Sequence, residues 1–409
     1  MRVAILNWTS RHVGGAETYV SHVAQALADR QHEIMLCHEQ DGPADRAPMS
    51  GMDRFVSCSI QTRGPEAARN ALAAWGPDVL LDHGFVDPEQ ARRLQDLAPS
   101  VFVAHAYYGT CISGSKTVRV PVTQPCARRF GPMCLVNFFP RRCGGLSPVT
   151  MARDYRTQSA RLRNIRRSTF VVTLSEHMRM EYLKHGFDAS RVVHLPPIGD
   201  APLAGGSAAR AMVEQKVGGR ARQLAYIGRV ERLKGCRELL AALPAVAAAA
   251  DAEIELTIAG DGSDLPRCRL LWAELSRSIP RTRVSFLGWS SQATCDRLLS
   301  GTDVFVMPSL WPEPFGLTGA EAVRRGVPVA AFRVGAVPEW LADGVNGALA
   351  PGNPPTVHGL ADAIVRCLRM GGTAVRSSEP SGSPHLDQLI AVLGAAAAGR
   401  HSLTLGAPA

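Results

Sequence analysis

The stretch MPSLWPEPFGLTGAEAVRRGVPVAAFRVGAVPEWLADGVNG, residues 307–347, decides the fold of this 409-residue chain. The residues just before it read as a strand. Pro312 and Pro314 keep the next residues out of a helix, because each fixes φ and removes an amide donor. We therefore expect a helix to begin near Gly316 or Leu317 and to end at Gly326, before a second short strand.

Two carboxylates flank the expected start of this helix. Glu313 lies in the loop before the helix, and Glu321 lies about one turn inside it. Between them, the amides of residues 315–319 form a helix N-terminus, which attracts negatively charged groups. An anion site between two carboxylates suits a ligand that has both phosphates and hydroxyls.

The same stretch resembles the signature of retaining GT-B glycosyltransferases, in particular the large family 4. Glu313-Pro-Phe-Gly-Leu317, a second glutamate eight residues later, and Gly326-Val-Pro-Val329 match that signature. Thr318-Gly319 and Val334-Gly335-Ala336 depart from it. The resemblance implies an α/β protein of GT-B fold, with two Rossmann-like doubly wound domains facing a cleft. It also implies donor-binding roles for Phe315, Gly316, Leu317 and Glu321.

A second motif, Gly-Arg-Val-Glu-Arg-Leu-Lys-Gly over residues 228–235, follows another strand-like run. It resembles the family motif in which an arginine and a lysine hold the donor diphosphate, and these roles fall to Arg229 and Lys234. Fixed cations stabilise the charge that a nucleoside diphosphate gains as the sugar departs, more in the transition state than in the ground state. Glycine turns follow at Gly260 and Gly288, where the family places the nucleotide base.

The N-terminal half reads as strands alternating with helices, which predicts a mostly parallel sheet. Gly14-Gly15-x-Glu17 matches the family's first loop, which lies over the donor phosphates and the acceptor; a plain strand–helix turn explains the glycines equally well. His105 ends a strand at the carboxyl edge, where ligands bind in open α/β sheets. The resemblance implies that His105 faces the transferred sugar, and a histidine bonded within the core is the alternative. Further strands are expected at residues 33–37, 54–58, 79–82, 101–105, 169–174 and 192–195.

The length of the chain favours two globular domains rather than one core. Hydrophobic residues make up 46% and charged residues 20% of it, which is ordinary for a soluble protein. The sequence has no run of about 18 apolar residues, so a membrane-spanning helix is not expected. The first residues read as a strand rather than a leader peptide. Ten cysteines without an export signal favour reduced thiols in the cytoplasm.

The expected domains follow from these patterns. We expect an N-terminal, acceptor-side domain over residues 1–200, with a Cys-rich basic insertion at about 106–168, and a C-terminal nucleotide-sugar domain over residues 201–370. Pro- and Gly-rich residues 196–219 mark the boundary. Residues 371–409 read as a loose loop, a helix at about 385–398 that crosses back to the first domain in this fold, and a disordered tail.

Four of the ten cysteines crowd into 33 residues of the insertion, namely Cys111, Cys126, Cys134 and Cys143. Their gaps of 15, 8 and 9 residues lack the CxxC pairs of a zinc ribbon. A segment with few buried hydrophobic residues nevertheless benefits from a metal or a cross-link. Similar Cys-rich insertions in some relatives favour a closed, structural Zn²⁺ site, while unlinked thiols and disulfides are the alternatives.

The net charge of +9 belongs to one segment, because residues 101–170 hold twelve Lys or Arg against a single acid, Asp154. Within it, Pro148 behind the expected N-cap Ser147 predicts a helix to about Arg167. That helix has arginines on one side and one apolar face, made of Met151, Tyr155, Leu162 and Ile165. A basic amphipathic helix can rest on an anionic membrane. A merely solvated face is the alternative, and nucleic acid is disfavoured because aromatic residues are not interleaved with the charges.

These features predict a retaining glycosyltransferase of the hexosyltransferase type, in the cytoplasm or at the inner face of the membrane. It would move a sugar from a UDP- or GDP-sugar to a glycan, lipid-linked or small-molecule acceptor in surface polysaccharide or glycoconjugate synthesis. The resemblance implies that Glu313 holds sugar hydroxyls, that Glu321 holds the ribose, and that the leaving phosphate helps to deprotonate the acceptor. No catalytic metal is expected, because no Asp-x-Asp motif follows a strand. A glycosidase would leave Arg229 and Lys234 without a role; a sugar-nucleotide epimerase and a degenerate binding subunit of the same fold are the alternatives.

Overall fold

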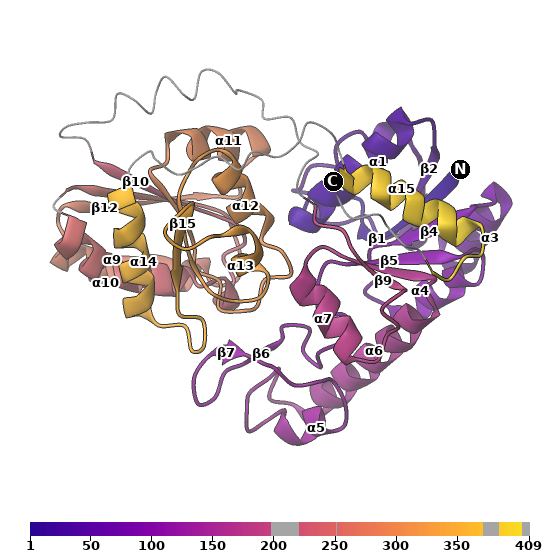
Figure 1. Ribbon diagram of the computed structural model, residues 1–409, viewed down its shortest axis with the longest axis horizontal. Coiled ribbons are helices and arrows are strands. Elements are labelled where there is room, and N and C mark those ends of the chain that lie inside the picture. The colour runs from indigo at the N-terminus through magenta and orange to yellow at the C-terminus, as the bar shows by residue number, and fades with distance from the viewer. Residues whose placement is uncertain (198–220, 251, 371–383, 403–409) are drawn as a thin grey trace. The chain divides into compact units, whose positions relative to one another are not determined.

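The computed structural model describes residues 1–197, 221–250, 252–370 and 384–402 (Figure 1). Within these ranges the chain forms two compact α/β units. Unit 1 comprises residues 1–116, 127–197 and 384–402, and unit 2 comprises residues 117–126 and the described part of 221–370. Most of the predicted linker, loose loop and tail lies outside the described residues.

The described part of unit 1 contains a parallel sheet with the strand order β3-β2-β1-β4-β5-β8-β9. The strands are β1 (Arg2–Thr9), β2 (Glu33–Gln40), β3 (Val56–Ser59), β4 (Val79–Asp82), β5 (Ser100–Ala104), β8 (Phe170–Thr173) and β9 (Val192–His194). β4, β5 and β8 are buried along their whole length. Continuous burial is typical of a parallel sheet with helices on both faces. All the strands predicted for this half are present.

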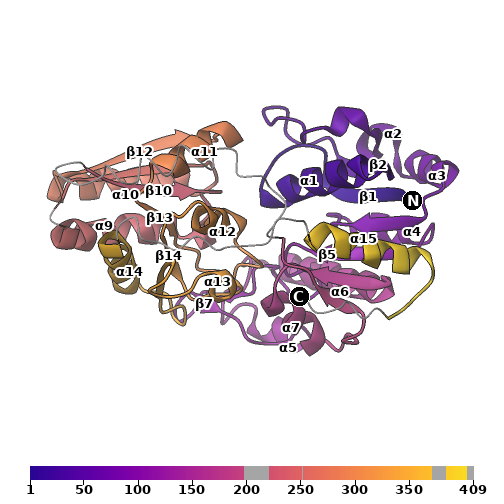
Figure 2. The same cartoon turned by 45° about the horizontal axis from the view of Figure 1, so that its top comes forward.

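Helices cover both faces of this sheet. Leu6 of β1 packs with Leu72 and Leu94 of two helices on one face. On the other side the last described helix contacts α1, β4 and β5, and Figure 2 shows it beside the sheet. The helices are α1 (Gly15–Asp29), α2 (Ile60–Arg63), α3 (Pro65–Trp75), α4 (Pro88–Gln95), α5 (Met133–Asn137), α6 (Pro148–Arg167), α7 (Glu176–Lys184) and α15 (Pro384–Ala397).

Helix α6 has the predicted bounds, but its apolar face is covered. Met151, Tyr155 and Leu162 pack against a small cluster of buried side chains, Ile112, Phe130 and Phe138, and Ile165 is also buried. The insertion itself packs against this face, so the apolar face of α6 is not a free surface. Contact of the protein with a membrane stays a prediction. No helix in the described part of the chain has the length and hydropathy to span a bilayer.

Unit 2 contains, within its described residues, a second parallel sheet with the order β12-β11-β10-β13-β14-β15. Its strands are β10 (Arg222–Ile227), β11 (Ile254–Ala259), β12 (Thr282–Gly288), β13 (Val304–Met307), β14 (Val329–Phe332) and β15 (Gly347–Ala350). Its helices are α9 (Cys236–Ala250), α10 (Leu265–Leu275), α11 (Gln292–Gly301), α12 (Leu317–Arg324), α13 (Val337–Trp340) and α14 (Val357–Met370). A two-stranded antiparallel pair, β6 (Thr117–Val118) and β7 (Gln124–Pro125), is separate from both sheets.

Both sheets share one topological feature that positions ligands. The strand order reverses between β1 and β4 in unit 1, and between β10 and β13 in unit 2. In doubly wound α/β folds, ligands bind outside the carboxyl ends of the strands at such a switch point. The residues that directly follow these four strands are therefore the first place to look for a site.

Candidate functional site

In unit 2, the loops that follow β10 and β13 pack directly against each other. The loop after β10 contains Arg229 and the 3-10 turn Arg232–Lys234. The amide of Leu310 donates to the carbonyl of Leu233 at 2.8 Å. A Cβ on Gly235 would lie only 1.7 Å from the carbonyl oxygen of Pro308. Only glycine permits this approach, which brings Lys234 beside the loop that contains Glu313.

Lys234 and Glu313 form an ion pair across the switch point. Nζ of Lys234 lies 2.7 Å from Oε1 of Glu313, and only 7% of the Glu313 side chain is exposed. Ser309 also donates to Oε1, and the Lys234 ammonium lies 4.9 Å from the centre of the Trp311 ring. Burial alone would raise the pKa of Glu313, but the charge of Lys234 and hydrogen bonds from Lys234, Ser309 and Trp311 outweigh it and lower the pKa. Glu313 is therefore an ionised carboxylate in a largely desolvated place.

Helix α12 begins at Leu317, as predicted, with an N-terminus that no side chain caps. The N-cap residue is Gly316, in the left-handed region at φ +91°. Trp340 stabilises this turn, because its indole N–H donates to the carbonyl of Phe315 at 2.7 Å. A Cβ on Gly319 would lie 2.5 Å from the Trp340 ring. The departure at Thr318-Gly319 is thus explained by a tryptophan that leaves no room for a side chain.

Glu321, one turn into α12, differs from Glu313 in its surroundings. Its side chain is 38% exposed and its nearest cation, Arg325, is 3.9 Å away. Partial burial raises the pKa of Glu321, and Arg325 opposes that shift. A half-exposed carboxylate without a close ion pair is available to an external hydroxyl.

A glycine also fixes the backbone of Glu313. A Cβ on Gly335 would lie 2.3 Å from the carbonyl oxygen of Glu313, and the amide of Ala336 donates to that oxygen at 2.9 Å. Gly335 has φ +57°, which also favours glycine. The single glycine in Val334-Gly335-Ala336 therefore supplies the close approach that this loop needs.

Glycines at the ends of three adjacent strands lie side by side. The amide of Gly228 donates to the carbonyl of Ala259 at 3.0 Å, and that of Gly260 donates to Gly288 at 2.7 Å. A Cβ on Gly260 would lie 1.8 Å from the carbonyl oxygen of Gly228. Arg229 follows this row with an exposed side chain, and its carbonyl accepts from the Tyr226 hydroxyl at 2.6 Å. Gly228, Gly260 and Gly288 therefore give unit 2, next to Arg229, an edge where no side chain covers the backbone.

The carboxyl edge of unit 1 has neutral rings in place of ions. His105 directly follows β5, and its Nε2 lies 2.8 Å from Nδ1 of His83, which directly follows β4. Tyr19 of α1 lies between this pair and α15, with its hydroxyl 2.8 Å from Nε2 of His385. Burial lowers the pKa of His105 and that of His385 to about 4 each. The pKa of His83 is also lowered, mainly by burial and to a smaller extent by electrostatic repulsion from His105. These rings are uncharged near neutral pH. His83 is buried, and His105 is half-buried.

The predicted glycine loop of unit 1 starts α1. Gly14 is the N-cap of α1 and makes no side-chain cap. Glu17 in the first turn is buried, and its carboxylate accepts from the Trp8 indole N–H at 2.8 Å. The hydrogen bond of Glu17 therefore links the first turn of α1 to the end of β1. Gly14 and Gly15 have no side chains that would cover the backbone at this turn.

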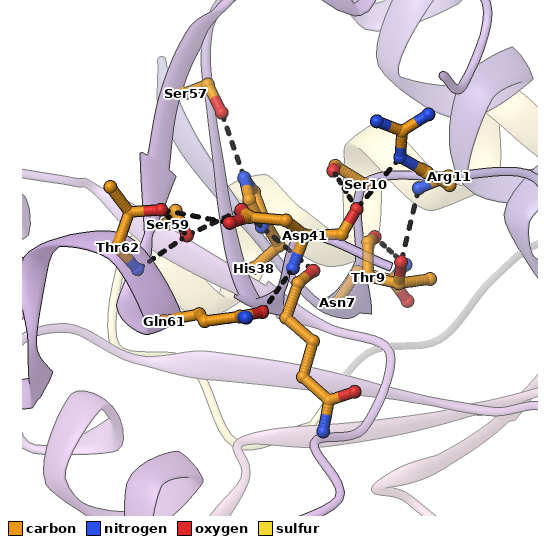
Figure 3. A network of polar contacts seen from close by, with 11 residues as sticks. Asn7, Thr9, Ser10, Arg11, His38, Asp41, Ser57, Ser59, Gln61 and Thr62 are labelled. Atoms are coloured by element: carbon orange, nitrogen blue, oxygen red, sulfur yellow. Dashed lines mark hydrogen bonds and ion pairs between the residues drawn. The ribbon is translucent and has the colours of Figure 1, made fainter. Parts of the chain in front are cut away.

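A polar network centred on Asp41 braces the same loop (Figure 3). Ser59 and Thr62 donate to the Asp41 carboxylate at 2.7 Å and 2.9 Å, and Arg11 Nε donates to the Asp41 carbonyl at 3.1 Å. Hydrogen bonds from Ser59 and Thr62 lower the pKa of Asp41 against a smaller effect of burial. Arg11 also donates to the carbonyl of Arg46 at 2.6 Å. The network ties the loop after β1 to the loop after β2, so it holds the segment leading to Gly14.

The four clustered cysteines do not form the predicted zinc site. Among the described residues, no group of three or more His, Cys, Asp or Glu side chains could hold a metal ion. Cys111 Sγ instead accepts from the Lys116 amide, Cys134 Sγ faces the Arg129 carbonyl and Cys143 Sγ faces the Asn137 carbonyl.

The insertion is stabilised by packing and by a buried ion pair in place of a metal. The Lys116 side chain is 2% exposed, and its Nζ lies 2.6 Å from Oε2 of Glu181. It also donates to the carbonyls of Thr110 and Arg128. These contacts join residues 110, 116 and 128 of the insertion to Glu181 of α7, in addition to the cluster around Phe138.

Comparison with known proteins gives matches along both halves of the chain. The family description "Glycosyltransferase Family 4" matches residues 13–200, and "Glycosyl transferases group 1" matches residues 221–370. The solved structure of Anabaena Alr3699/HepE in complex with UDP and glucose superposes with a TM-score of 0.65 at 18% identity, covering 96% of this chain and 99% of that one. The chain belongs to the GT-B glycosyltransferases. The predicted fold and the predicted class of enzyme are confirmed.

Two curated relatives are similar to this glycosyltransferase in sequence. A glycogen synthase from Mycobacterium tuberculosis is 25% identical over 397 residues, which cover 89% of this chain and 85% of the relative. A D-inositol 3-phosphate glycosyltransferase from Corynebacterium urealyticum is 35% identical over 152 residues. That second match spans 36% of this chain and only 35% of the relative's length.

Sequence reasoning missed several residues of the glycosyltransferase that the structure brings to the candidate site. Ser309, Trp311 and Trp340 surround Glu313 and the start of α12. His83 could have been found, because it follows the strand β4 in the same way as His105 follows β5. Asp41 and Arg11 carried no local signal, since their contacts join loops that are distant in sequence.

Proposed function

We propose that unit 2 binds the diphosphate of a nucleotide sugar at the carboxyl ends of β10 and β13. The observation that supports this most strongly is the Lys234–Glu313 pair beside the uncapped N-terminus of α12. Lys234, Arg229 and the first amides of α12 supply positive charge for two phosphates. Glu313, held ionised, would accept hydrogen bonds from sugar hydroxyls, and half-exposed Glu321 would accept those of the ribose.

The same arrangement supports a retaining transfer mechanism. As the bond between sugar and phosphate breaks, negative charge grows on the leaving diphosphate, where Lys234 and Arg229 would stabilise it. The leaving phosphate oxygen would then take the proton from the attacking acceptor hydroxyl on the same face of the sugar. Two cations and a helix N-terminus give the charge compensation that a divalent ion supplies in other transferases, so the proposal includes no catalytic metal.

The nucleotide that we favour is a uridine diphosphate. The Anabaena structure with the same fold contains UDP and glucose. The row of bare backbone at Gly228, Gly260 and Gly288 would receive the base, because a flat ring can lie directly against glycine. A GDP-sugar is the alternative donor, which nucleotide binding distinguishes.

Unit 1 would hold the acceptor and one side of the sugar. Neutral His105, oriented by His83, would exchange a hydrogen bond with a sugar hydroxyl, and the Gly14-Gly15 backbone would lie close to the donor phosphates. The acceptor is a glycan, a lipid-linked saccharide or a small hydroxylated molecule, in the synthesis of a surface polysaccharide or glycoconjugate. A cytoplasmic location agrees with ten free cysteines, since thiols stay reduced there.

Donor turnover tests this function. The purified protein is incubated with UDP- and GDP-sugars, and release of the nucleotide and the anomeric form of the first product are followed by NMR. We expect one donor to be consumed with retained configuration, and Lys234→Ala to lower turnover by about 10²- to 10³-fold. Arg232→Ala is the matched control, because Arg232 lies in the same turn but pairs with Glu238 at 2.7 Å. An inverted product, or conversion of the donor to an epimer, would contradict the proposal.

A further inference from the structure

The end of the insertion exposes a group of large apolar side chains. Met133 and Val136 of α5, Phe139 just after it, and Leu146 and Val149 around the start of α6 are between 37% and 77% exposed. We name these five residues the α5 patch. Scattered apolar residues are normal on a surface, but five within 17 residues of one short segment are not explained by chance exposure.

The five side chains belong to one short segment of unit 1, residues 133–149. Met133 and Val136 are three residues apart and so lie on one face of α5. The turn after α5 folds over the buried ring of Phe138, with the Cys143 amide donating to the Phe138 carbonyl at 3.0 Å and Gly144 against the ring. That turn leads into Leu146 and Val149. Leu135 of α5 and Met151 of α6 pack against the cluster that contains Phe138, so both helices that flank the turn rest on the same small cluster.

Arginines surround this apolar surface almost without acids. Residues 128–156 contain six arginines and one acid, Asp154. Val149 begins a stripe along α6 in which the exposed residues Arg153, Arg156 and Arg163 follow at helical spacing. The exposed Arg142 lies in the turn between Phe139 and Leu146. The segment therefore exposes both large apolar side chains and arginines, with a single acid among them.

The surface is held firmly by the rest of unit 1. The buried Lys116–Glu181 pair fixes the base of the insertion, and the Phe130 amide donates to Nε2 of His185 at 2.9 Å. On the other side, Arg161 of α6 lies over the Tyr108 ring at 4.6 Å and donates to the carbonyl of Phe85. The α5 patch is thus presented by an ordered scaffold and has no need to fold before it binds.

We propose that the α5 patch docks this protein on an anionic lipid bilayer. The aliphatic and phenyl side chains would enter the boundary between headgroups and acyl chains, and the arginines would contact the anionic headgroups. A nucleic acid would call for several exposed aromatic rings among the cations, and Phe139 is the single aromatic residue of the patch. The surface differs from the one predicted from the sequence, because the buried face of α6 takes no part in it.

Vesicle flotation of the full-length protein tests the docking surface. We expect binding to vesicles that contain phosphatidylglycerol and much weaker binding to phosphatidylcholine alone, with further loss at high salt. Val136→Asp with Phe139→Asp should reduce binding by about tenfold or more, because apolar insertion is replaced by charges that the lipid repels. Arg153→Gln and Arg156→Gln should each reduce it about fivefold. Leu270→Asp, at an equally exposed apolar residue of α10, is the matched control and should bind as the wild type does.

Four results would overturn the docking surface, and none depends on turnover of a sugar donor. Wild-type protein that does not float with anionic vesicles would exclude it, as would equal binding to neutral vesicles. Full binding by the Val136→Asp, Phe139→Asp variant, shown to be folded by circular dichroism, would place any membrane contact elsewhere. A concentration-dependent dimer that this variant abolishes, in the absence of lipid binding, would instead assign the patch to a second copy of the chain.

Discussion

The two sheets of this glycosyltransferase have matching strand orders but carboxyl edges of opposite chemistry. In unit 2, the residues after β10 and β13 form a buried ion pair, Lys234–Glu313, next to a bare helix N-terminus. In unit 1, the residues after β4 and β5 are His83 and His105, two uncharged rings joined by one hydrogen bond. The topology gives each unit a carboxyl edge where a ligand can bind, and a few side chains decide what each edge can bind.

This difference suits the two carboxyl edges to different kinds of ligand. A charged edge with opposed cations and a carboxylate can bind phosphates and hydroxyls together, and it can respond to charge that develops during a reaction. An uncharged, partly buried edge suits a neutral hydroxylated molecule, since a histidine can donate or accept one hydrogen bond there. The predictions below alter one edge while leaving the other intact.

Removal of the Lys234 ammonium should have the largest effect. We expect Lys234→Ala to lower turnover by about 10²- to 10³-fold, the scale of one lost donor to a developing charge. Nucleotide release from the preferred sugar donor is the measurement. Arg232→Ala should change turnover little, and a comparable loss in that variant would show that the whole turn, rather than Lys234, is sensitive.

The close backbone contact between Gly260 and Gly228 in unit 2 should be nearly as sensitive to substitution. A Cβ at residue 260 would overlap the carbonyl oxygen of Gly228, so Gly260→Ala should destabilise unit 2 by about 3 kcal/mol. Gly288→Ala has open space around its Cβ and costs only the strain of a positive φ, about 1 kcal/mol. Urea unfolding of both variants measures the difference. Equal losses would mean that the row of glycines is not closely packed.

The histidines of unit 1 should make the protein less stable in mild acid. His105 and His385 have pKa values of about 4 in the folded chain, below their ordinary value, so between about pH 6.5 and 4 only the unfolded chain binds the extra protons. Stability should therefore fall as the pH falls through that window, by about 1.4 kcal/mol per pH unit for each such histidine. Urea unfolding across this range should show the slope. His385→Gln should flatten it, whereas His358→Gln, at an exposed residue of α14, should leave it unchanged.

Loss of the His105 ring should have the smallest effect on function. One hydrogen bond to an uncharged sugar hydroxyl is worth about 1 kcal/mol, so His105→Ala should lower kcat/KM by roughly tenfold or less. His83→Phe should give a similar loss, because it removes the partner that orients His105. A loss as large as that of Lys234→Ala would contradict the idea that unit 1 presents a neutral edge.

The sequence was sufficient to predict the structural elements that depend on neighbouring residues alone. Two prolines and a glycine placed the start of α12 at Leu317, and Ser147-Pro148 placed the start of α6. Alternating strands and helices gave both parallel sheets, since buried strands and amphipathic helices have distinct periods. The Glu313 and Lys234 motifs were expected to follow strands, and they do follow β13 and β10. The roles of both residues stay predictions.

The rest depended on contacts between distant residues, which local pattern does not show. Lys234 and Glu313 are 79 residues apart, and their pairing follows from the close packing of Gly235 against Pro308. The zinc prediction failed because cysteine spacing says little about where thiols point. Lys116, which reads as a surface charge, is the buried group that holds the insertion. The apolar face of α6 looked available because nothing in the sequence showed that Phe130 and Phe138 cover it.

Nucleotide binding measured by calorimetry tests the assignment of the charged edge most directly. UDP, GDP and ADP are titrated into the wild type, Arg229→Ala and Arg232→Ala. We predict that one nucleotide, UDP in our proposal, binds the wild type and Arg232→Ala with similar affinity. Binding should be at least about tenfold weaker in Arg229→Ala, because a phosphate-binding arginine is lost. Equal binding by Arg229→Ala, or no binding of any nucleotide to the wild type, would contradict a diphosphate site at the carboxyl edge of unit 2.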